Sequence, residues 1–391
     1  MIDTICLLVP KYKIVSLQGI SKWELYSKTE QYEKFVRNPN KQEKGTGKYF
    51  PRLTGYKRGA STEANVRIEF SIPKLIFLNN LDEVTNDNFS RVIQTLQDRL
   101  QEMGLIISQS VLINASVSSV HYSKNIPLED GYTSTYLISE MNKVNLRKSF
   151  DFTRAKYTND GQCLYAHTTA HQLVIYDKVA DLNKDKKRAI DKDQTEYQSS
   201  LFSKMNNENN LKEILRFEIR LNQKQKLNKV FEGLGYNKNP TFKEIFSEEK
   251  SKSVVMDYWN KLIKERNLGL FSISISNKDI LQNLFLVNQN LKPKQAVYLL
   301  GLFILAKDEN GMRQLRTIVS KKSNDRTWYR IAKDVQKVSE NLTKNKIRNW
   351  VAQIDKTLEN NSKTVISNLN ALTNTGDYFV NSMAVHNSHL N

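Results

Sequence analysis

Cysteine is almost absent from this chain, which has only Cys6 and Cys163 among its 391 residues. The two are not spaced as metal ligands are, and two cysteines cannot supply the framework of bridges that staples small secreted domains. The sequence therefore excludes a cysteine-based zinc site and a disulfide scaffold. Its cysteine usage fits a reducing cytosol.

Long apolar runs are also absent. The longest, AVYLLGLFILA at residues 296–306, is well short of the roughly 18 residues that span a bilayer, and it predicts a buried helix. The opening MIDTICLLVPKYK has no positive segment before its apolar stretch and no small-residue cleavage site, so it does not predict a signal peptide. We therefore expect a cytoplasmic protein with no membrane partner.

Positive charge is abundant. Lys and Arg total 59 against 41 Asp and Glu, which gives a formal net charge of +18. A field of this sign and size favours a polyanionic partner, foremost nucleic acid, and predicts salt-dependent affinity. The ordinary alternatives are solubility and a lysine-rich proteome. At 39% hydrophobic residues the chain can bury a core, and its length suits two domains.

Hydrophobic patterning divides the chain into a strand-rich part and a helical part. A helix is expected over 87–105, and the segments that favour strands are 1–10, 65–71, 105–125, 132–141, 150–158, 163–178 (a hairpin) and 214–222. Helices are expected at 254–267, 295–308, 311–322 and 326–338, the last two resembling a helix-turn-helix. We predict an α+β fold: a mostly antiparallel-sheet domain over 1–235, a helical DNA-binding region over 240–345 and a polar tail over 346–391.

Three of the expected strands carry polar side chains on one face. The residues are Tyr176 and Lys178 in LVIYDK, Arg216, Glu218 and Arg220 in ILRFEIRL, and His121 in SVSSVHYSK. If these strands are neighbours, a tyrosine, a lysine, an acid, a histidine and two arginines converge on one surface.

Such a set suits cleavage of a phosphodiester. A tyrosine hydroxyl, with a pKa of about 10, needs a divalent metal or a base to act as a nucleophile. A carboxylate and imidazoles can hold the metal, and cationic side chains can balance transition-state charge and grip phosphates. Because the chain lacks a serine-base motif, a phosphate-cradling glycine loop and a zinc spacing, covalent tyrosine chemistry fits best.

Each of these residues also has an ordinary structural interpretation. A tyrosine in a strand usually packs the sheet, and a glutamate between arginines usually forms surface ion pairs that contribute little. His121 can be a satisfied polar residue, and His167 and His171 lie near an expected turn, where exposed histidines are common.

In their order and spacing, these segments resemble the replication-initiation endonucleases of filamentous phages and related phage and plasmid elements, which start rolling-circle replication. The resemblance covers about residues 1–345 and rests on MIDTICLLVP, RIEFSIPKLIFLNNLDEV, SVSSVHYSKN, LVIYDKVADL, LRFEIRLN and RTWYR. It implies an HUH/Rep-like nicking domain.

The resemblance implies that Tyr176 is the nucleophile. It would attack a phosphate at the replication origin, become linked to the 5′ phosphate, release a 3′ hydroxyl as primer and later religate the strand. Lys178 and Asp181 match the lysine and acid that follow the tyrosine, and Asp181 would be a further candidate metal ligand. Glu218 matches an acid in or beside the metal site. His121 stands where the family often has Asp, which keeps a metal ligand but removes a charge.

The resemblance also implies a metal and partners. The family's two-histidine metal motif has only His167 and His171 as candidates here, and the metal would be Mg²⁺ or Mn²⁺. RTWYR would bring Arg326, Tyr329 and Arg330 to DNA, in addition to Arg216 and Arg220. The partners would be supercoiled or single-stranded origin DNA together with a host helicase and polymerase, in the cytoplasm of a bacterial cell.

Two further interpretations stay open. One is a non-catalytic DNA-binding replication accessory protein on the same fold, and the other is a plasmid-mobilisation relaxase. Separately, TGDYFVNSMAVHNS at residues 375–388 resembles the last block of an intein, in which His386 would assist cyclisation of Asn387. No N-terminal splicing block accompanies it, so we interpret it as coincidence or a fusion remnant.

Overall fold

The computed structural model describes most of the chain. The described ranges are 1–17, 23–28, 32–58, 65–144, 146, 154–158, 161–182, 213–265, 267–272, 276–308, 310–341 and 347–360. They belong to one compact unit, Met1–Asn361. The intein-like segment at 375–388 and the charged segment at 183–212 lie outside the described residues.

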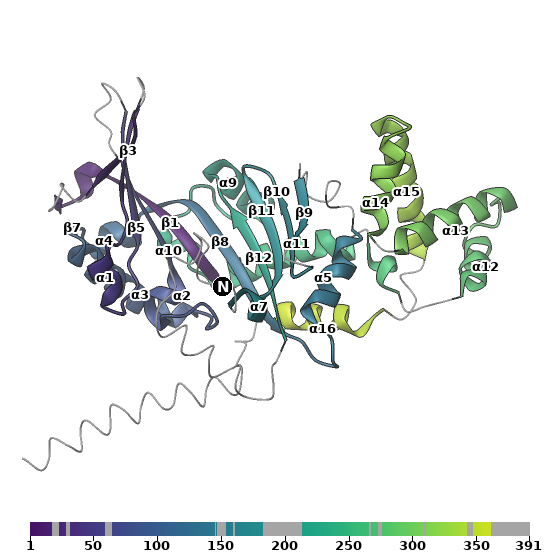
Figure 1. Cartoon of the computed structure of the whole chain (residues 1–391), viewed down its shortest axis with the longest axis horizontal. Coiled ribbons are helices and arrows are strands. Elements are labelled where there is room, and N and C mark those ends of the chain that lie inside the picture. Colours follow the sequence, from purple (N-terminus) through teal and green to yellow (C-terminus); the bar gives the residue numbers. More distant parts are fainter. Residues whose placement is uncertain are drawn as a thin grey trace, which may run out of the picture. The chain divides into compact units, whose positions relative to one another are not determined.

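Ten strands form one antiparallel sheet across the described residues (Figure 1). Its order is β3-β4-β5-β6-β1-β8-β12-β11-β10-β9, and β2 and β7 form a separate pair. The strands are β1 (Ile2–Pro10), β2 (Ser16–Leu17), β3 (Glu24–Lys28), β4 (Tyr32–Arg37), β5 (Arg52–Arg58), β6 (Asn65–Ser71), β7 (Leu105–Ile106), β8 (Ser116–Pro127), β9 (Arg154–Thr158), β10 (Cys163–His167), β11 (His171–Asp177) and β12 (Ile214–Leu221). The predicted α+β class and antiparallel sheet are confirmed.

The helices fall into two groups along the chain. Those interspersed among the strands are α1 (Lys41–Gly45), α2 (Ile72–Phe77), α3 (Phe89–Glu102), α4 (Gln109–Ile113), α5 (Ser134–Asn142) and α7 (Lys178–Leu182). Those after the last strand are α9 (Lys224–Gly233), α10 (Phe242–Ile245), α11 (Glu248–Trp259), α12 (Asn277–Val287), α13 (Pro293–Lys307), α14 (Gly311–Ser320), α15 (Asp325–Asn341) and α16 (Asn349–Asn360). No described helix is both long enough and apolar enough to cross a membrane.

One face of the sheet packs against helices and forms the core. The alternate residues of β12 and β8 that point to this face, such as Phe217, Ile219 and Tyr122, are fully buried. The ring of Phe217 meets Trp259 of α11 edge-on at 6.1 Å between centroids. Farther along the same face, Phe70 of β6 packs on α10. Burial of one face fixes the register, so the alternate residues must lie on the opposite face.

Two segments predicted as strands are partly or wholly helical. The stretch 105–125 contains α4, where the Ser108 hydroxyl caps the helix by accepting a hydrogen bond from the Val111 amide. The stretch 132–141 is largely α5, capped in the same way by Thr133, which accepts from the Tyr136 amide. The first prediction is confirmed over β7 and β8 and wrong only over α4, and the second is wrong over α5. In both helices a side-chain cap at the start outweighs the β-prone composition.

The compact unit does not divide where the sequence suggested. Helices α10 and α11, placed by the sequence in a separate helical region, pack on the sheet. Helix α16 lies inside the predicted polar tail of 346–391, yet it buries Trp350 and Ile354 and contacts α11 and β8. The sheet and its covering helices therefore share one core that continues to the end of α16.

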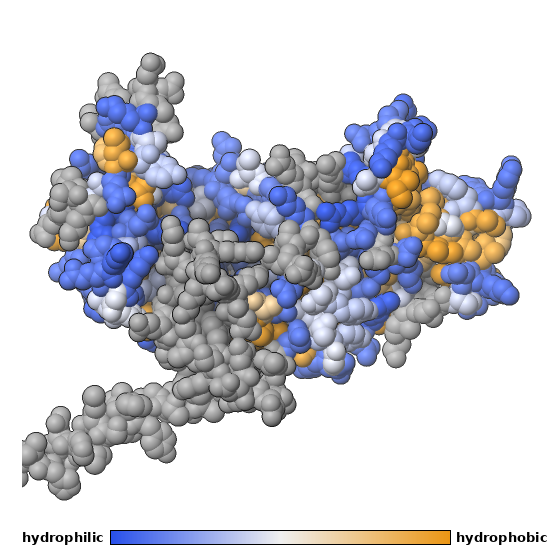
Figure 2. Space-filling model, in the orientation of Figure 1, coloured by the Kyte–Doolittle hydropathy of each residue, from blue (hydrophilic) through white to orange (hydrophobic). Residues whose placement is uncertain are grey.

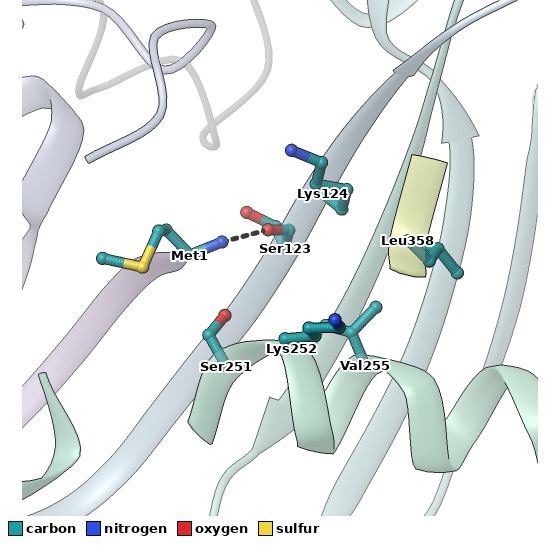
Figure 3. A pocket seen from close by; sticks show the side chains of 7 residues that line it. All are labelled: Met1, Ser123, Lys124, Ser251, Lys252, Val255 and Leu358. Atoms are coloured by element: carbon teal, nitrogen blue, oxygen red, sulfur yellow. Dashed lines mark hydrogen bonds between the residues drawn. The ribbon is translucent and has the colours of Figure 1, made fainter. Parts of the chain in front are cut away.

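A small pocket lies on the helix-covered side of the sheet, between β8, α11 and α16 (Figure 3). Its walls include Ser123 and Lys124 of β8 and Val255 of α11, and the Met1 amino group donates a 2.8 Å hydrogen bond to the Ser123 carbonyl. The pocket does not include Tyr176. The polar residues singled out by the sequence lie elsewhere.

Candidate active site

The sheet face opposite the helical core carries the predicted polar residues. Strand pairing aligns Tyr176 of β11 with Arg216 of β12, and Arg220 of β12 with His121 of β8. Glu218 lies between the two arginines on the same face. Because β8, β12 and β11 are consecutive in the sheet, the expected convergence on one face is confirmed for the tyrosine, the acid, the histidine and the two arginines. Lys178 lies beyond the strand, at the start of α7.

Asp3 completes this group and was missed in the sequence. It lies at the start of β1, where the pairing with β8 shifts register between Ile2 and Thr4. Bulges of this kind redirect a side chain and are common next to active sites. The sequence could have indicated it, because Asp3 is the only charged residue of this mostly apolar strand.

Asp3, His121 and Glu218 form a group that can hold a metal ion. Each offers one ligand atom, and these three atoms lie within 4.8 Å of one another. Two carboxylate oxygens and one imidazole nitrogen suit Mn²⁺ or Mg²⁺. The Nε2 atom of His121 lies 3.3 Å from the Asn222 side-chain oxygen. If Nε2 carries the proton and donates to Asn222, then Nδ1, 3.9 Å from Glu218, keeps its lone pair for a metal.

Glu218 is the centre of the polar network. Its carboxylate accepts a hydrogen bond of 2.7 Å from Nε of Arg220 and lies 3.5 Å from Nε of Arg216. The Tyr176 hydroxyl donates to its other oxygen at 3.3 Å. Burial alone would raise the pKa of this carboxyl, but the charges of Arg220 and Arg216 outweigh burial and hold the pKa well below its usual range. Glu218 is therefore negatively charged and a poor base.

The guanidinium of Arg216 is buried within this network and does not reach solvent. Arg216 is 2% exposed, and its guanidinium donates to Asp3 at 2.6 Å, to the Asn125 side chain at 3.1 Å and to the Asn80 carbonyl at 2.9 Å. It was predicted as a DNA contact. In this structure it orients the carboxylates, while Arg220, with a third of its side chain exposed, keeps access to solvent.

Tyr176 and Lys178 are neighbours, but not along a strand as the sequence suggested. Strand β11 ends at Asp177 and Lys178 opens α7, so a helical turn brings its Nζ to 5.7 Å from the Tyr176 ring centroid. Burial raises the pKa of the half-buried Tyr176 well above its ordinary value, and the positive charge of Arg216 only partly opposes this. The hydroxyl therefore needs activation.

Lys178 is fully buried, and its Nζ has no hydrogen-bond partner among the described residues. Burial, together with the nearby charge of Arg216, lowers its pKa to about 7, against the opposing influence of Asp181. A side chain with no exposed atoms cannot grip a phosphate at the surface. An amine with a lowered pKa can instead take up or release a proton near neutral pH.

The other two histidines lie away from the group formed by Asp3, His121 and Glu218, which we call the metal-type group. His167 is on the polar face, but β10 is three strands from β8, which puts it roughly 14 Å from His121 at the usual strand spacing. His171 is buried on the opposite, helix-covered face, where Nδ1 lies 2.8 Å from the hydroxyl of Tyr258. The structure therefore does not place either as a ligand of the same ion.

The predicted DNA contacts in the helical part lie on the surface of α15. Arg326, Tyr329 and Arg330 are exposed, Tyr329 by 52%, while Trp328 between them is buried. Their helical spacing puts these three side chains on one side, opposite the buried tryptophan.

In comparisons with protein-family models, with curated proteins and with solved structures, nothing matches this chain. What this site can do is therefore inferred from its chemistry. A tyrosine hydroxyl, a metal-type triad and charge-balancing cations can together carry out phosphoryl transfer to an oxygen nucleophile.

Proposed function

We propose that this chain is a metal-dependent DNA-nicking and strand-transfer enzyme of the HUH/Rep-like type, acting as a rolling-circle replication initiator with Tyr176 as its nucleophile. One observation carries the proposal. The Tyr176 hydroxyl is bound to Glu218, which shares a metal-type group with Asp3 and His121 on a single sheet face. The resemblance of the segment order to phage replication initiators supports the same activity.

In the proposed reaction the Tyr176 oxygen attacks the phosphorus of one phosphodiester at the origin. The bond from the tyrosine oxygen to phosphorus forms and the bond from phosphorus to the 3′ oxygen breaks. The 5′ phosphate stays on the protein, and the 3′ oxygen takes a proton from water to become the primer hydroxyl. A water would relay the phenolic proton to the neutral amine of Lys178, whose Nζ makes no direct hydrogen bond to the hydroxyl. Glu218 orients the hydroxyl by its hydrogen bond. Attack by a 3′ hydroxyl reverses these steps and religates the strand.

Asp3, His121 and Glu218 would hold a divalent cation, Mg²⁺ or Mn²⁺, which supplies Lewis-acid polarisation of the phosphate when bound. Arg216 and Arg220 already balance the charges of the two carboxylates. A cation therefore adds uncompensated positive charge, which the phosphates of DNA would offset. We expect metal and DNA to raise each other's affinity.

The partner that this charge distribution favours is DNA. The chain has a net charge of +18, and α15 presents Arg326, Tyr329 and Arg330 to solvent. We propose that these side chains bind phosphates outside the nicking site, which fixes the position of the strand without reading its sequence. A replication initiator inside a bacterial cell would also meet a host helicase and polymerase.

The test is trapping of the covalent intermediate. Wild type and Tyr176→Phe are incubated with single-stranded and supercoiled DNA of the replicon that encodes the chain, in Mn²⁺. Wild type should form a protein–DNA adduct on a denaturing gel, and mass spectrometry should place the phosphate on Tyr176. Tyr165→Phe, on the neighbouring strand β10, is the matched control and should form the adduct. An adduct with Tyr176→Phe would refute the nucleophile assignment.

Two observations favour the non-catalytic accessory protein instead. Two arginines already form ion pairs with Glu218, and burial raises the pKa of Tyr176. This alternative predicts DNA binding by wild type with no adduct in Mn²⁺ or Mg²⁺ on any DNA of the replicon. A relaxase would instead form its adduct on an origin-of-transfer strand and not on the replication origin.

A further inference from the structure

Helix α13 exposes an apolar face that the described part of the chain leaves uncovered. Its inner side, which includes Leu299, Phe303 and Ala306, is buried in the group formed with α12, α14 and α15. Its outer side carries a stripe of residues exposed to solvent: Val297, Tyr298, Gly301, Ile304 and Leu305. The expected wholly buried helix is therefore wrong on one side. We refer to these five residues as the α13 stripe.

The apolar members of the α13 stripe are well exposed and lie together on one side of a single helix. Val297 is 59% exposed and Leu305 is 51% exposed. Figure 2 shows hydrophobic side chains gathered over α12 and α13, where Leu286 and Val287 at the end of α12 are also exposed. Contiguous apolar surface of this kind on a charged protein marks an interaction site.

The α13 stripe is symmetric about its centre. At 100° per residue, its members and Lys294 lie within about 60° of Gly301 around the helix, and Asp308 follows as the C-cap residue just after α13. Lys294 is seven residues before Gly301 and Asp308 is seven residues after it, and both are exposed. The apolar members match in the same way, Val297 with Leu305 and Tyr298 with Ile304.

This symmetry favours one occupant, a second copy of the same helix. In an antiparallel pair centred on Gly301, each apolar member lies level with an apolar member of the other copy. Lys294 of each copy then lies level with Asp308 of the other. Such matching of a surface with itself is what a two-fold interface requires. A parallel pair would instead put lysine beside lysine.

Gly301, at the two-fold axis of this pair, has no side chain and lets the two helices approach closely. A Cβ added there would meet nothing within 4 Å, so no contact within the described chain accounts for a glycine in mid-helix. Glycine in a helix interior is unfavourable, and a helix partner approaching closely is a physical reason to have it there.

We propose that the chain forms a two-fold symmetric homodimer through antiparallel packing of the α13 stripes. Helix α13 has 15 residues, which makes it about 22 Å long, so the contact is smaller than the ~1,200 Å² of a standard interface. Its dissociation constant should therefore lie in the micromolar range. The proposal does not depend on nicking activity.

The test is sedimentation equilibrium of the full chain without DNA, from about 1 to 100 µM. The mass should rise from that of one 45.4 kDa chain toward twice that value. Leu305→Glu should raise the dissociation constant more than tenfold. Gly301→Gln should do the same while raising the midpoint of thermal unfolding, which separates loss of the dimer from loss of the fold. Leu25→Glu, at an exposed leucine on β3, is the control and should change nothing.

A charge exchange makes the test specific to the antiparallel register. Lys294→Asp and Asp308→Lys should each weaken the dimer severalfold, and the double variant should restore it. A monomer at every concentration, or a dimer unaffected by these variants, would overturn the proposal. So would wild type that stays monomeric and binds phosphatidylserine vesicles through Leu305, because that result assigns the stripe to a membrane surface.

Discussion

The hydroxyl of Tyr176 donates a hydrogen bond of 3.3 Å to Oε2 of Glu218, across two adjacent strands of the sheet. This contact ties the residue that the sequence marks as a nucleophile to the carboxylate that anchors the polar network. It also links the tyrosine to the metal-type group, because Glu218 is shared by both.

Glu218→Gln should destabilise the fold strongly. The change removes the negative charge between Arg216 and Arg220 and leaves the buried Arg216 without part of its compensation, for which a loss of about 3–5 kcal/mol is typical. Urea unfolding measures it. The control Glu232→Gln breaks an exposed ion pair with Lys238 and should cost less than about 1 kcal/mol. Equal, small losses in both variants would contradict the assigned network.

Asp3→Asn should lower Mn²⁺ affinity by about tenfold or more, because it removes one of two anionic ligand oxygens. Calorimetric titration with Mn²⁺ measures this, and adding single-stranded DNA should raise the affinity of wild type. Asp87→Asn, at an exposed acid of the surface, is the control and should leave the titration unchanged. Unchanged binding by Asp3→Asn would remove Asp3 from the site.

Lys178→Met should stabilise the protein near neutral pH. The pKa of Lys178 falls to about 7 in the folded state, so between about pH 7 and its ordinary value of 10.5 the unfolded chain holds a proton that the folded chain lacks. The stability of wild type therefore rises with pH in this window. Methionine removes this dependence and should gain a few kcal/mol at pH 7, with the advantage shrinking toward pH 10. Denaturant unfolding of both proteins across this range checks the slope, and a pH-independent difference would contradict it.

His121 and His171 should behave oppositely when replaced. His171→Leu removes a partner of the buried Tyr258 hydroxyl and should cost about 1–3 kcal/mol of stability, with Mn²⁺ affinity unchanged. His121→Ala, at a partly exposed residue, should lower Mn²⁺ affinity with a smaller loss of stability. Thermal unfolding and Mn²⁺ titration on the same preparations separate the two roles. Loss of metal binding in His171→Leu would restore that residue as a ligand.

Arg326→Gln combined with Arg330→Gln should weaken DNA binding to all sequences alike. Each lost phosphate contact reduces the slope of log affinity against log salt by about 0.9, so the double variant should lose about two units of slope. Fluorescence anisotropy over a salt series measures it. Lys238→Gln, at an exposed lysine outside α15, is the control. An unchanged slope in the double variant would exclude α15 from the DNA contact.

The sequence predicted those elements whose patterns are enforced by burial. The strict alternation in 214–222 predicted β12 because one of its faces must meet the core, and the spacing in 87–105 predicted α3 for the same reason. It did not predict α4 and α5, since both start from a single capping hydroxyl that competes with a β-prone composition. The exposed side of α13 was missed because an apolar composition cannot reveal which neighbours cover it.

For the site, the sequence by itself determined residue types and faces. Tyr176, Glu218 and His121 share a sheet face because alternation in their strands leaves no other choice. Only the tertiary structure decided distances and partners. The order β1-β8-β12-β11 brings in Asp3 from the start of the chain, encloses Arg216 among acceptors and leaves His167 three strands from His121. Strand order depends on pairings between residues far apart in the chain, and no local pattern in the sequence records them.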